Sequence, residues 1–432
     1  MRSIPLAARY LALALGLAAL AACDNKVPTA TGRDLFPGGS APISVDLVLP
    51  ASDFVLRDTV YDFGQLHDVP YLVVAHQFDG ALEAHGLASF GDFPDSVAYP
   101  AGGTSTESYT FGTGRVITQI DSATSTPNAT PVSLRLWLLE QSFDSATVTW
   151  ANASDQGGNP VAWKTAGGTL GRLIGETTWT PGDSVHLDTL TWTIDSAAVQ
   201  ALATHQASGV AVTAATAGSR LIIRTLRLIA SVHPASAPDT VVPLAPSSGK
   251  QTFIVNAPPP TPPGVLRVGG ITQARSVLQL DLSRPVPACA HPETTPDCPS
   301  IPLSDVTLDR ALLLFTPVPV TSGYRPVSTA TLSLRRLAEP ELGRLAPLAG
   351  VLAQADASPA LFLAGNDSSF RLDVTSAISS AVQKDSTSIS TALLIPPLQP
   401  GVPQVPDVGY FWFDTTPRLR LIYTLPLRPT LP

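Results

Sequence analysis

Residues 131–138 read Pro-Val-Ser-Leu-Arg-Leu-Trp-Leu, and residues 417–423 read Pro-Arg-Leu-Arg-Leu-Ile-Tyr. In both stretches apolar side chains occupy every second position, which is the period of a strand that buries one face. We therefore expect the alternating leucines to be core residues and the arginines between them to reach solvent from the opposite face. The core residues predicted in this way are Leu134, Leu136, Leu419 and Leu421, and the solvent-facing residues are Arg135, Arg418 and Arg420.

The composition extends this strand pattern to the whole chain. Its 432 residues include 42 Pro and 31 Gly, and 44% of the residues are hydrophobic. A chain of this length is too long for a single core and favours two domains. Short strands separated by Pro and Gly turns predict an all-β fold of two tandem jelly-roll β-sandwiches. Short helical turns are expected only near residues 196–204 and 376–383.

The two halves of the chain also resemble each other in pattern and in order, which indicates an internal repeat. The corresponding segments are 59–63 and 252–255, 71–75 and 265–268, 131–137 and 329–335, 196–203 and 377–382, and 225–230 and 417–423. A general likeness among strand-rich segments is the alternative explanation. We predict sandwiches of the same strand order at residues 42–235 and 251–428, joined with few contacts by a Pro-rich linker at 236–250.

The N-terminus has the features of a bacterial lipoprotein signal. Arg2 and Arg9 precede an apolar stretch of about 12 residues, which is shorter than the ~20 residues of a spanning helix. The stretch ends in Leu-Ala-Ala-Cys at residues 20–23, the form of a lipobox. We expect residues 1–22 to be removed, Cys23 to be acylated and residues 23–41 to form a flexible tether. An ordinary signal peptide with an incidental cysteine is the alternative.

A lipobox predicts a lipid-anchored protein of the cell envelope, with the bilayer as partner through the acylated Cys23. The outer membrane or the cell surface is favoured, although Asp24 leaves an inner-membrane leaflet possible. The formal net charge is −8. Because no basic patch stands out, nucleic acid is not an expected partner. A glycan or another envelope protein remains as the expected ligand.

The other two cysteines, Cys289 and Cys298, bracket a short loop in a chain that is expected to be exported. Outside the cytoplasm a disulfide is permitted, and we predict that these two cysteines form one. A metal site that uses both cysteines with His291 is the alternative, but it lacks a clear fourth ligand.

Three further stretches carry a family resemblance. Residues 143–150 read Phe-Asp-Ser-Ala-Thr-Val-Thr-Trp, residues 372–378 contain Asp-Val-Thr, and residues 416–423 contain Pro-Arg-Leu. Together they resemble the DNRLRE-type domains of bacterial surface proteins, which are similar to carbohydrate-binding jelly rolls. No DNRLRE string occurs in this chain, and residues 342–348 replace the Val-Thr-Trp signature in the second half. The resemblance implies a fold and a surface location rather than a ligand.

The sequence offers little catalytic chemistry. It contains no Gly-x-Ser-x-Gly elbow and no phosphate-binding glycine loop. Glu83 and His85 share a strand face, with His67 and His76 nearby, but a polar strand face explains them without a metal. Paired carboxylates such as Glu339 and Glu341 are common on surfaces. We therefore expect a non-catalytic protein without cofactor or metal, and a hydrolase is the second alternative.

The tryptophans suggest the first alternative to a general envelope protein, which is a pair of carbohydrate-binding modules. Five of the six tryptophans lie in the first half of the chain, and indole rings stack on sugar rings. Trp163 and Trp179 stand beside Gly or turn residues, so they are the pair predicted to be exposed and to bind a glycan. The competing interpretation is core packing.

Overall fold

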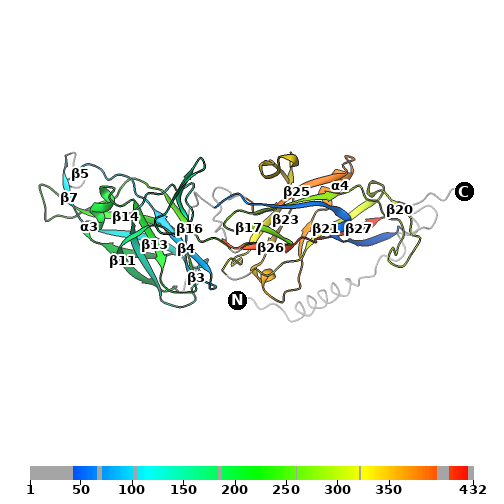
Figure 1. Ribbon diagram of the computed structural model, residues 1–432, viewed down its shortest axis with the longest axis horizontal. Coiled ribbons are helices and arrows are strands. Elements are labelled where there is room, and N and C mark those ends of the chain that lie inside the picture. The colour runs from blue at the N-terminus through cyan, green and yellow to red at the C-terminus, as the bar shows by residue number, and fades with distance from the viewer. Residues whose placement is uncertain are drawn as a thin grey trace, which may run out of the picture.

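The computed structural model describes residues 42–426 except 66–70, 101–104, 183–186, 259, 321–322 and 397–407. The described chain forms two β-sandwich lobes that follow one another along the long axis of the molecule (Figure 1). We call residues 71–256 the first lobe, and residues 42–65 with 260–426 the second lobe. Within these residues no helix is both long and apolar enough to cross a membrane. The predicted all-β sandwich fold is confirmed.

The first lobe is built from one ten-stranded antiparallel sheet that folds over on itself. Its order is β11-β8-β13-β4-β3-β14-β7-β12, with β15 added to β14 and β16 added to β4. The strands are β3 (Leu72–Phe78), β4 (Leu82–Ala88), β7 (Tyr109–Asp121), β8 (Val132–Leu139), β11 (Leu170–Trp179), β12 (Leu187–Ile194), β13 (Gly209–Ala214), β14 (Ser219–Pro234), β15 (Val242–Leu244) and β16 (Gln251–Val255).

The long strand β14 turns this sheet into two layers. Its first part, from Ser219 to Ile223, pairs with β3, and its second part, from Leu226 to Pro234, pairs with β7. The register shifts between Ile223 and Leu226, and such a bulge bends a strand. The alternating residues of β8 point into the space between the layers, so that Leu134 and Leu136 are fully buried.

The second lobe has a four-stranded sheet of order β1-β27-β21-β24 and a five-stranded sheet of order β2-β18-β25-β22-β23, with β17 paired to β26. The strands are β1 (Ser44–Leu49), β2 (Val55–Tyr61), β17 (Val265–Gly269), β18 (Arg275–Asp281), β21 (Thr307–Phe315), β22 (Ala330–Leu337), β23 (Leu348–Ala357), β24 (Phe370–Asp373), β25 (Ser388–Leu394), β26 (Tyr410–Asp414) and β27 (Arg418–Thr424).

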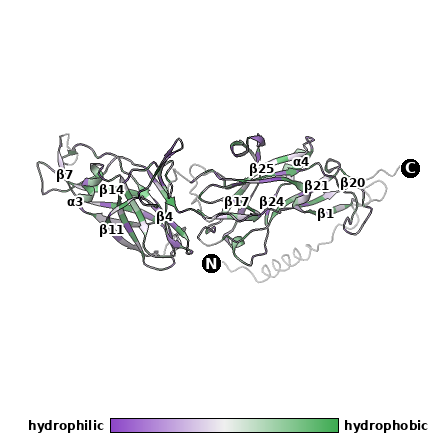
Figure 2. Ribbon diagram, viewed as in Figure 1, coloured by the Kyte–Doolittle hydropathy of each residue, from purple (hydrophilic) through white to green (hydrophobic). Residues whose placement is uncertain are grey.

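The apolar side chains of this lobe fill the space between its two sheets, and hydropathy alternates along the strands (Figure 2). Leu419 and Leu421 are buried, as predicted. Arg420 and, in the first lobe, Arg135 keep about 40% of their side chains exposed, at 41% and 43%. Arg418 is exposed. The two quoted stretches therefore behave as half-buried strands.

Each lobe also carries one short helix in the same place in its strand sequence. Helix α3 (Ser196–Ala203) follows β12, and helix α4 (Thr375–Val382) follows β24. Asp195 caps α3 by accepting a hydrogen bond from the backbone N–H of Ala198. Both helices occur where the sequence predicts helical turns, whereas the four-residue helix α2 (Ala51–Phe54) of the second lobe is not predicted.

The strand orders of the two lobes correspond. The neighbours β11-β8-β13-β4 in the first lobe match β23-β22-β25-β18 in the second, and β14-β7-β12 match β27-β21-β24. The bend in β14 corresponds to the break between β26 and β27, because β3 pairs with the first part of β14 and β17 pairs with β26. The predicted order of strands is therefore repeated.

The predicted boundaries, however, are wrong at both ends. The first two strands, β1 and β2, pair with β27 and β18 of the second lobe. Conversely β15 and β16, which precede the second lobe in sequence, pair with β14 and β4 of the first lobe. The strand pair before each repeat thus completes the other repeat, and each pair takes the same position. The physical reason is that a strand belongs to the lobe with which it forms hydrogen bonds. Because the two lobes have the same strand order, the alternating pattern of these strands does not show which lobe they join.

The expectation of few contacts between the lobes is also wrong. A buried apolar cluster contains Tyr71 and Phe78 from the first lobe together with Tyr324 and Trp412 from the second. The Tyr324 hydroxyl donates to the backbone carbonyl of Asn256 at 3.0 Å. Arg325 and Asp79 form an ion pair across the same region. The interface is therefore packed like a core rather than spanned by a loose linker.

Candidate functional site

The two tryptophans predicted to bind a glycan are buried. Only 5% of Trp163 and 3% of Trp179 is exposed. The indole N–H of Trp163 donates to the backbone carbonyl of Thr149 at 2.9 Å, and that of Trp179 donates to the Asp188 carboxylate at 2.9 Å. Rings held in this way cannot stack on a sugar, so the prediction of an exposed pair is wrong and core packing explains them.

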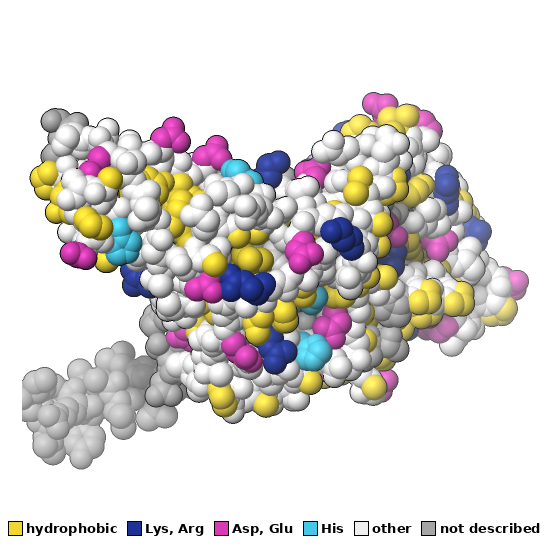
Figure 3. All heavy atoms as spheres, turned by 60° about the vertical axis from the view of Figure 1, so that its left-hand side comes forward, with side chains coloured by type: hydrophobic (Ala, Val, Ile, Leu, Met, Phe, Trp, Pro, Cys, Tyr) yellow, Lys and Arg dark blue, Asp and Glu magenta, His cyan; other side chains and the backbone are white. Residues whose placement is uncertain are grey.

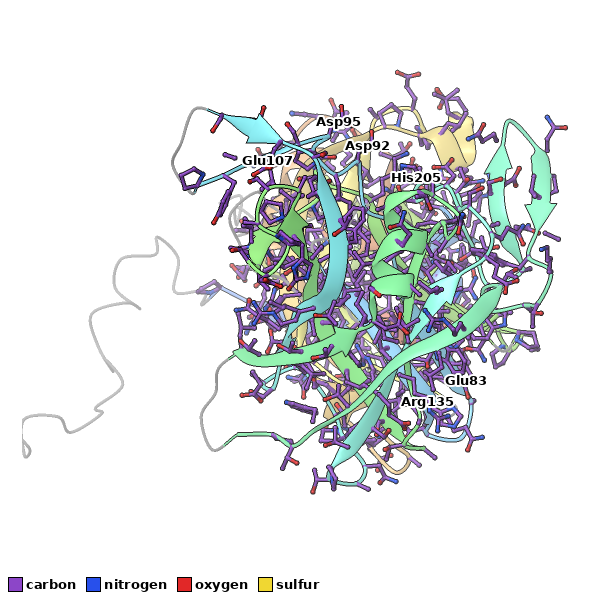
Figure 4. The ribbon with its side chains drawn as sticks, turned by 90° about the vertical axis from the view of Figure 1, so that its left-hand side faces the viewer. Glu83, Asp92, Asp95, Glu107, Arg135 and His205 are labelled. Atoms are coloured by element: carbon purple, nitrogen blue, oxygen red, sulfur yellow. A yellow bond between two sulfur atoms is a disulfide. The ribbon has the colours of Figure 1, made fainter. Side chains whose placement is uncertain are left out.

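The histidines near β4 do not converge on a common site. His76 pairs with Glu83 at 3.1 Å, whereas His85 donates through Nδ1 to the backbone carbonyl of Gly167 at 2.6 Å. Burial lowers the pKa of His85. Glu83 and His205 lie in different parts of the first lobe (Figure 4). His67 lies outside the described residues. Among the residues that the structure describes, no group of three or more His, Cys, Asp or Glu side chains could hold a metal ion.

Charged side chains of both signs are scattered over the visible surface, between patches of apolar atoms (Figure 3). Glu339 and Glu341 are exposed on a 3-10 turn at Pro340–Leu345. Neither carboxylate lines a described cavity. These surface groups therefore do not mark a site.

Cys289 and Cys298 form a disulfide, as predicted. Cys23 lies outside the described residues. We expect unreduced protein to weigh two hydrogens less than reduced protein by intact mass spectrometry. Changing both cysteines to serine should lower the free energy of unfolding by roughly 2–3 kcal/mol, because opening so short a loop restores unfolded-chain entropy. Two freely alkylated thiols before reduction would contradict the bond.

The candidate site is a hollow of about 200 Å³ in the second lobe, which we call the α4 cavity. It lies between α4 and the inner face of the sheet at β22, β23 and β25, and it opens to solvent; Figure 1 places α4 beside β25. Its polar lining consists of Arg336, Ser376, Ser380, Lys384, Ser386 and Ser388. It has no carboxylate in its lining.

The register of the sheets shows what occupies this place in the first lobe. Leu139 ends β8 opposite Leu170, the first residue of β11, and Leu337 ends β22 opposite Leu348, the first residue of β23. The residue before each of these leucines is therefore equivalent. That residue is Leu138 in the first lobe, where it is buried in the core, and Arg336 in the second.

The two helices also differ at an equivalent position, where the second lobe has a smaller side chain. Counted from the buried pair Val199 in α3 and Ile378 in α4, Leu202 of the first lobe corresponds to Ala381 of the second. Leu202 is packed into the core of the first lobe, while Ala381 lines the α4 cavity. The smaller side chain leaves open the space that leucine fills in the first lobe.

A third difference concerns the edge of the α4 cavity, where the helix meets the sheet. Arg172 of β11 forms two hydrogen bonds of 2.7 and 3.0 Å to Asp195, the cap of α3. The Arg172 guanidinium, helped by the Ala198 N–H, holds the pKa of Asp195 down at about 2. The equivalent of Arg172 is Gly350, and no atom lies within 4 Å of a Cβ placed there. The second lobe thus lacks the ion pair that ties helix to sheet in the first.

The two cations of the α4 cavity are not neutralised by the protein. Among the described residues, the side chain of neither Arg336 nor Lys384 has a hydrogen-bond or ion-pair partner, although both residues form backbone hydrogen bonds. The sequence alone does not predict this site, because an arginine in a leucine position can be recognised only when the register of both lobes is known. The Ser-rich stretch from Ser376 to Ser380 was the one signal available in the sequence.

Comparison with known proteins adds little. No family model matches the chain, and no curated protein matches it. One solved structure that matches is the N-terminal CBM22-1-CBM22-2 tandem domain from Paenibacillus barcinonensis Xyn10C, at 9% sequence identity. The match covers 85% of this chain and 97% of that chain, with a TM-score of 0.17. So low a TM-score supports no inference about a ligand.

Proposed function

We propose that this protein is a non-catalytic, lipid-anchored protein of the cell envelope that binds an envelope component in the α4 cavity. One observation carries the binding role: equivalent positions are filled by leucines in the first lobe and are hollow and cationic in the second. A lobe that needed only stability would keep the filled arrangement, since leucines at these positions bury more apolar surface. Ligand sites are usually concavities in which a few polar groups orient the ligand against an apolar lining, and the α4 cavity combines both kinds of side chain.

The anchoring role rests on the lipobox at residues 20–23 and on the tether that follows it. Residues 24–41 lie outside the described part of the chain; a random coil of about 18 residues would span roughly 25 Å and would keep the second lobe close to the bilayer. Several acyl chains on one cysteine give a stable anchor.

Cys23→Ser should abolish this anchor, because serine lacks the sulfur that accepts the lipid. We expect the wild-type protein to incorporate labelled fatty acid and to sediment with membranes. The variant should not incorporate the label, and it should be either released from the membrane or trapped before its release. A variant that still incorporates the label would show that the lipoprotein assignment is wrong.

Binding is tested with the lipid-free Cys23→Ser protein and isolated cell-envelope fragments. The protein should sediment with the fragments, and a further Ala381→Leu change should reduce the bound fraction at least fivefold by filling the α4 cavity. Ala360→Leu is the matched control, because Ala360 is exposed outside the cavity. Equal sedimentation of all three proteins would contradict a binding role for this cavity.

A further inference from the structure

The charge of the α4 cavity selects for an anion. Arg336 on β22 and Lys384 after α4 line the same hollow, and no carboxylate is part of its lining. Two cations that share one cavity repel each other, so a bound anion is favoured by both. A guanidinium presents a planar pair of donors that fits a carboxylate in two-point fashion. The first lobe, with Leu138 in the equivalent place, offers no such group.

The α4 cavity is larger than a simple ion needs. A single bound water needs roughly 10–15 Å³ of cavity volume. A hollow of about 200 Å³ therefore holds several water-sized groups beside the anion. Drug-sized ligands occupy sites of roughly 300–1,000 Å³, so the ligand must be smaller than these. A single ring that carries one acidic group meets both limits.

The rest of the polar lining consists of serines. Ser376 and Ser380 project from α4, while Ser386 and Ser388 approach from the start of β25. A hydroxyl both donates and accepts hydrogen bonds, so a group of them suits a ligand that is itself covered with hydroxyls. Leu352 and Ile389 complete the lining with apolar surface, on which the C–H face of a ring can lie.

We propose that the α4 cavity binds the carboxylate-bearing ring of an acidic sugar, with Arg336 and Lys384 on the carboxylate and the serines on the ring hydroxyls. This inference rests on the proposed function, because it names the ligand class of the same site. It needs no tryptophan, and it assigns binding to the second lobe only.

The test uses the full-length Cys23→Ser protein, titrated with galacturonate and glucuronate and followed by calorimetry and by NMR of the sugar protons. One of the two acids should bind at least tenfold more tightly than galactose or glucose at low salt. The difference should shrink as salt screens the charges. Equal binding of neutral and acidic sugars would overturn the proposal. Inorganic phosphate that binds as tightly as either acid would show an anion site without sugar recognition, which also overturns it.

Three variants locate the ligand. Arg336→Leu and Lys384→Gln remove one cation each, and Ala381→Leu fills the hollow with the charges kept. Each should weaken binding of the acidic sugar at least tenfold. Arg418→Gln, on the exposed face of β27, is the control for loss of a cation and should bind as wild type. Thermal melting checks folding, and Lys384→Gln alters only an exposed side chain, so that folding cannot decide its result. Wild-type affinity in Lys384→Gln and Ala381→Leu would refute the placement.

The outcome also separates this inference from the function on which it rests. If Ala381→Leu abolishes binding to envelope fragments but the protein has no affinity for either acidic sugar, the acidic-sugar proposal is refuted and the cavity remains the binding site. If the protein binds neither envelope fragments nor acidic sugars, the proposed binding function and the acidic-sugar proposal are both refuted.

Discussion

Deleting residues 42–61 is expected to unfold the second lobe, although most of that lobe lies more than 200 residues further along the chain. The deletion removes β1 and β2, which pair with β27 and β18 at the edges of both sheets. Val45, Phe54 and Val60 then leave the core of the lobe, with Val45 and Phe54 at most 1% exposed in the intact protein. We expect the free energy of unfolding lost with these two strands to exceed the roughly 5–15 kcal/mol that stabilises a typical domain.

The first lobe supplies the control, because its strands run without interruption from β3 to β16. It contains five of the six tryptophans, so indole fluorescence should report its melting separately. In the deletion variant we expect this transition to persist, at a lower temperature because the lobe interface is lost. The second lobe should be digested by protease under native conditions.

Fragments sharpen the same test. A fragment of residues 71–256 should fold, whereas a fragment of residues 251–428 should not, and adding a peptide of residues 42–61 should restore protection to the latter. Cooperative melting of residues 251–428 without the peptide would contradict the exchanged pairing. It would instead support the boundaries that sequence analysis predicts.

Phe413→Ala should strongly destabilise the second lobe. The Phe413 ring lies 5.4 Å from each of the rings of Phe315, Phe362 and Phe370, between the sheets. Truncating a buried phenylalanine leaves a cavity and costs about 3–5 kcal/mol. Chemical denaturation should show this loss in the transition of the second lobe.

The control for Phe413→Ala is Leu345→Ala, because 80% of Leu345 is exposed. This change should alter the free energy of unfolding by less than about 0.5 kcal/mol. A small effect at Phe413 would show that the aromatic cluster does not hold the sheets together.

The elements that sequence analysis predicts correctly are those fixed by local pattern. Leu134 and Leu421 are buried because alternation along one strand is enough to assign a face. The two short helices and the repeated strand order follow from patterns of the same kind. The disulfide follows from the number of cysteines, since only Cys289 and Cys298 remain once Cys23 is assigned to lipid.

What the sequence does not predict depends on partners far away in the chain. Whether β2 joins β18 or β4 is decided by edges that present the same hydrogen-bonding groups, and no local signal separates them. Trp163 and Trp179 lie beside turns, yet each is buried because its N–H finds an acceptor inside. In the sequence Arg336 cannot be distinguished from any other polar residue of a strand, because its equivalence to Leu138 depends on the register of both lobes.

The exchanged strands impose an order on folding during synthesis. The first lobe has all of its strands once Val255 has been made, so it can close while the rest of the chain is still being added. Ser44 at the start of β1 must wait for Thr424, its partner in β27. At 5–20 residues per second, the 170 or so residues that separate the two events take roughly 10–30 s. For that time β1 is an unpaired strand beside a finished lobe, whereas β2 waits only until its partner β18 has been made, and unpaired strands readily aggregate. The second lobe therefore cannot complete its four-stranded sheet until its last strand, β27, has been made.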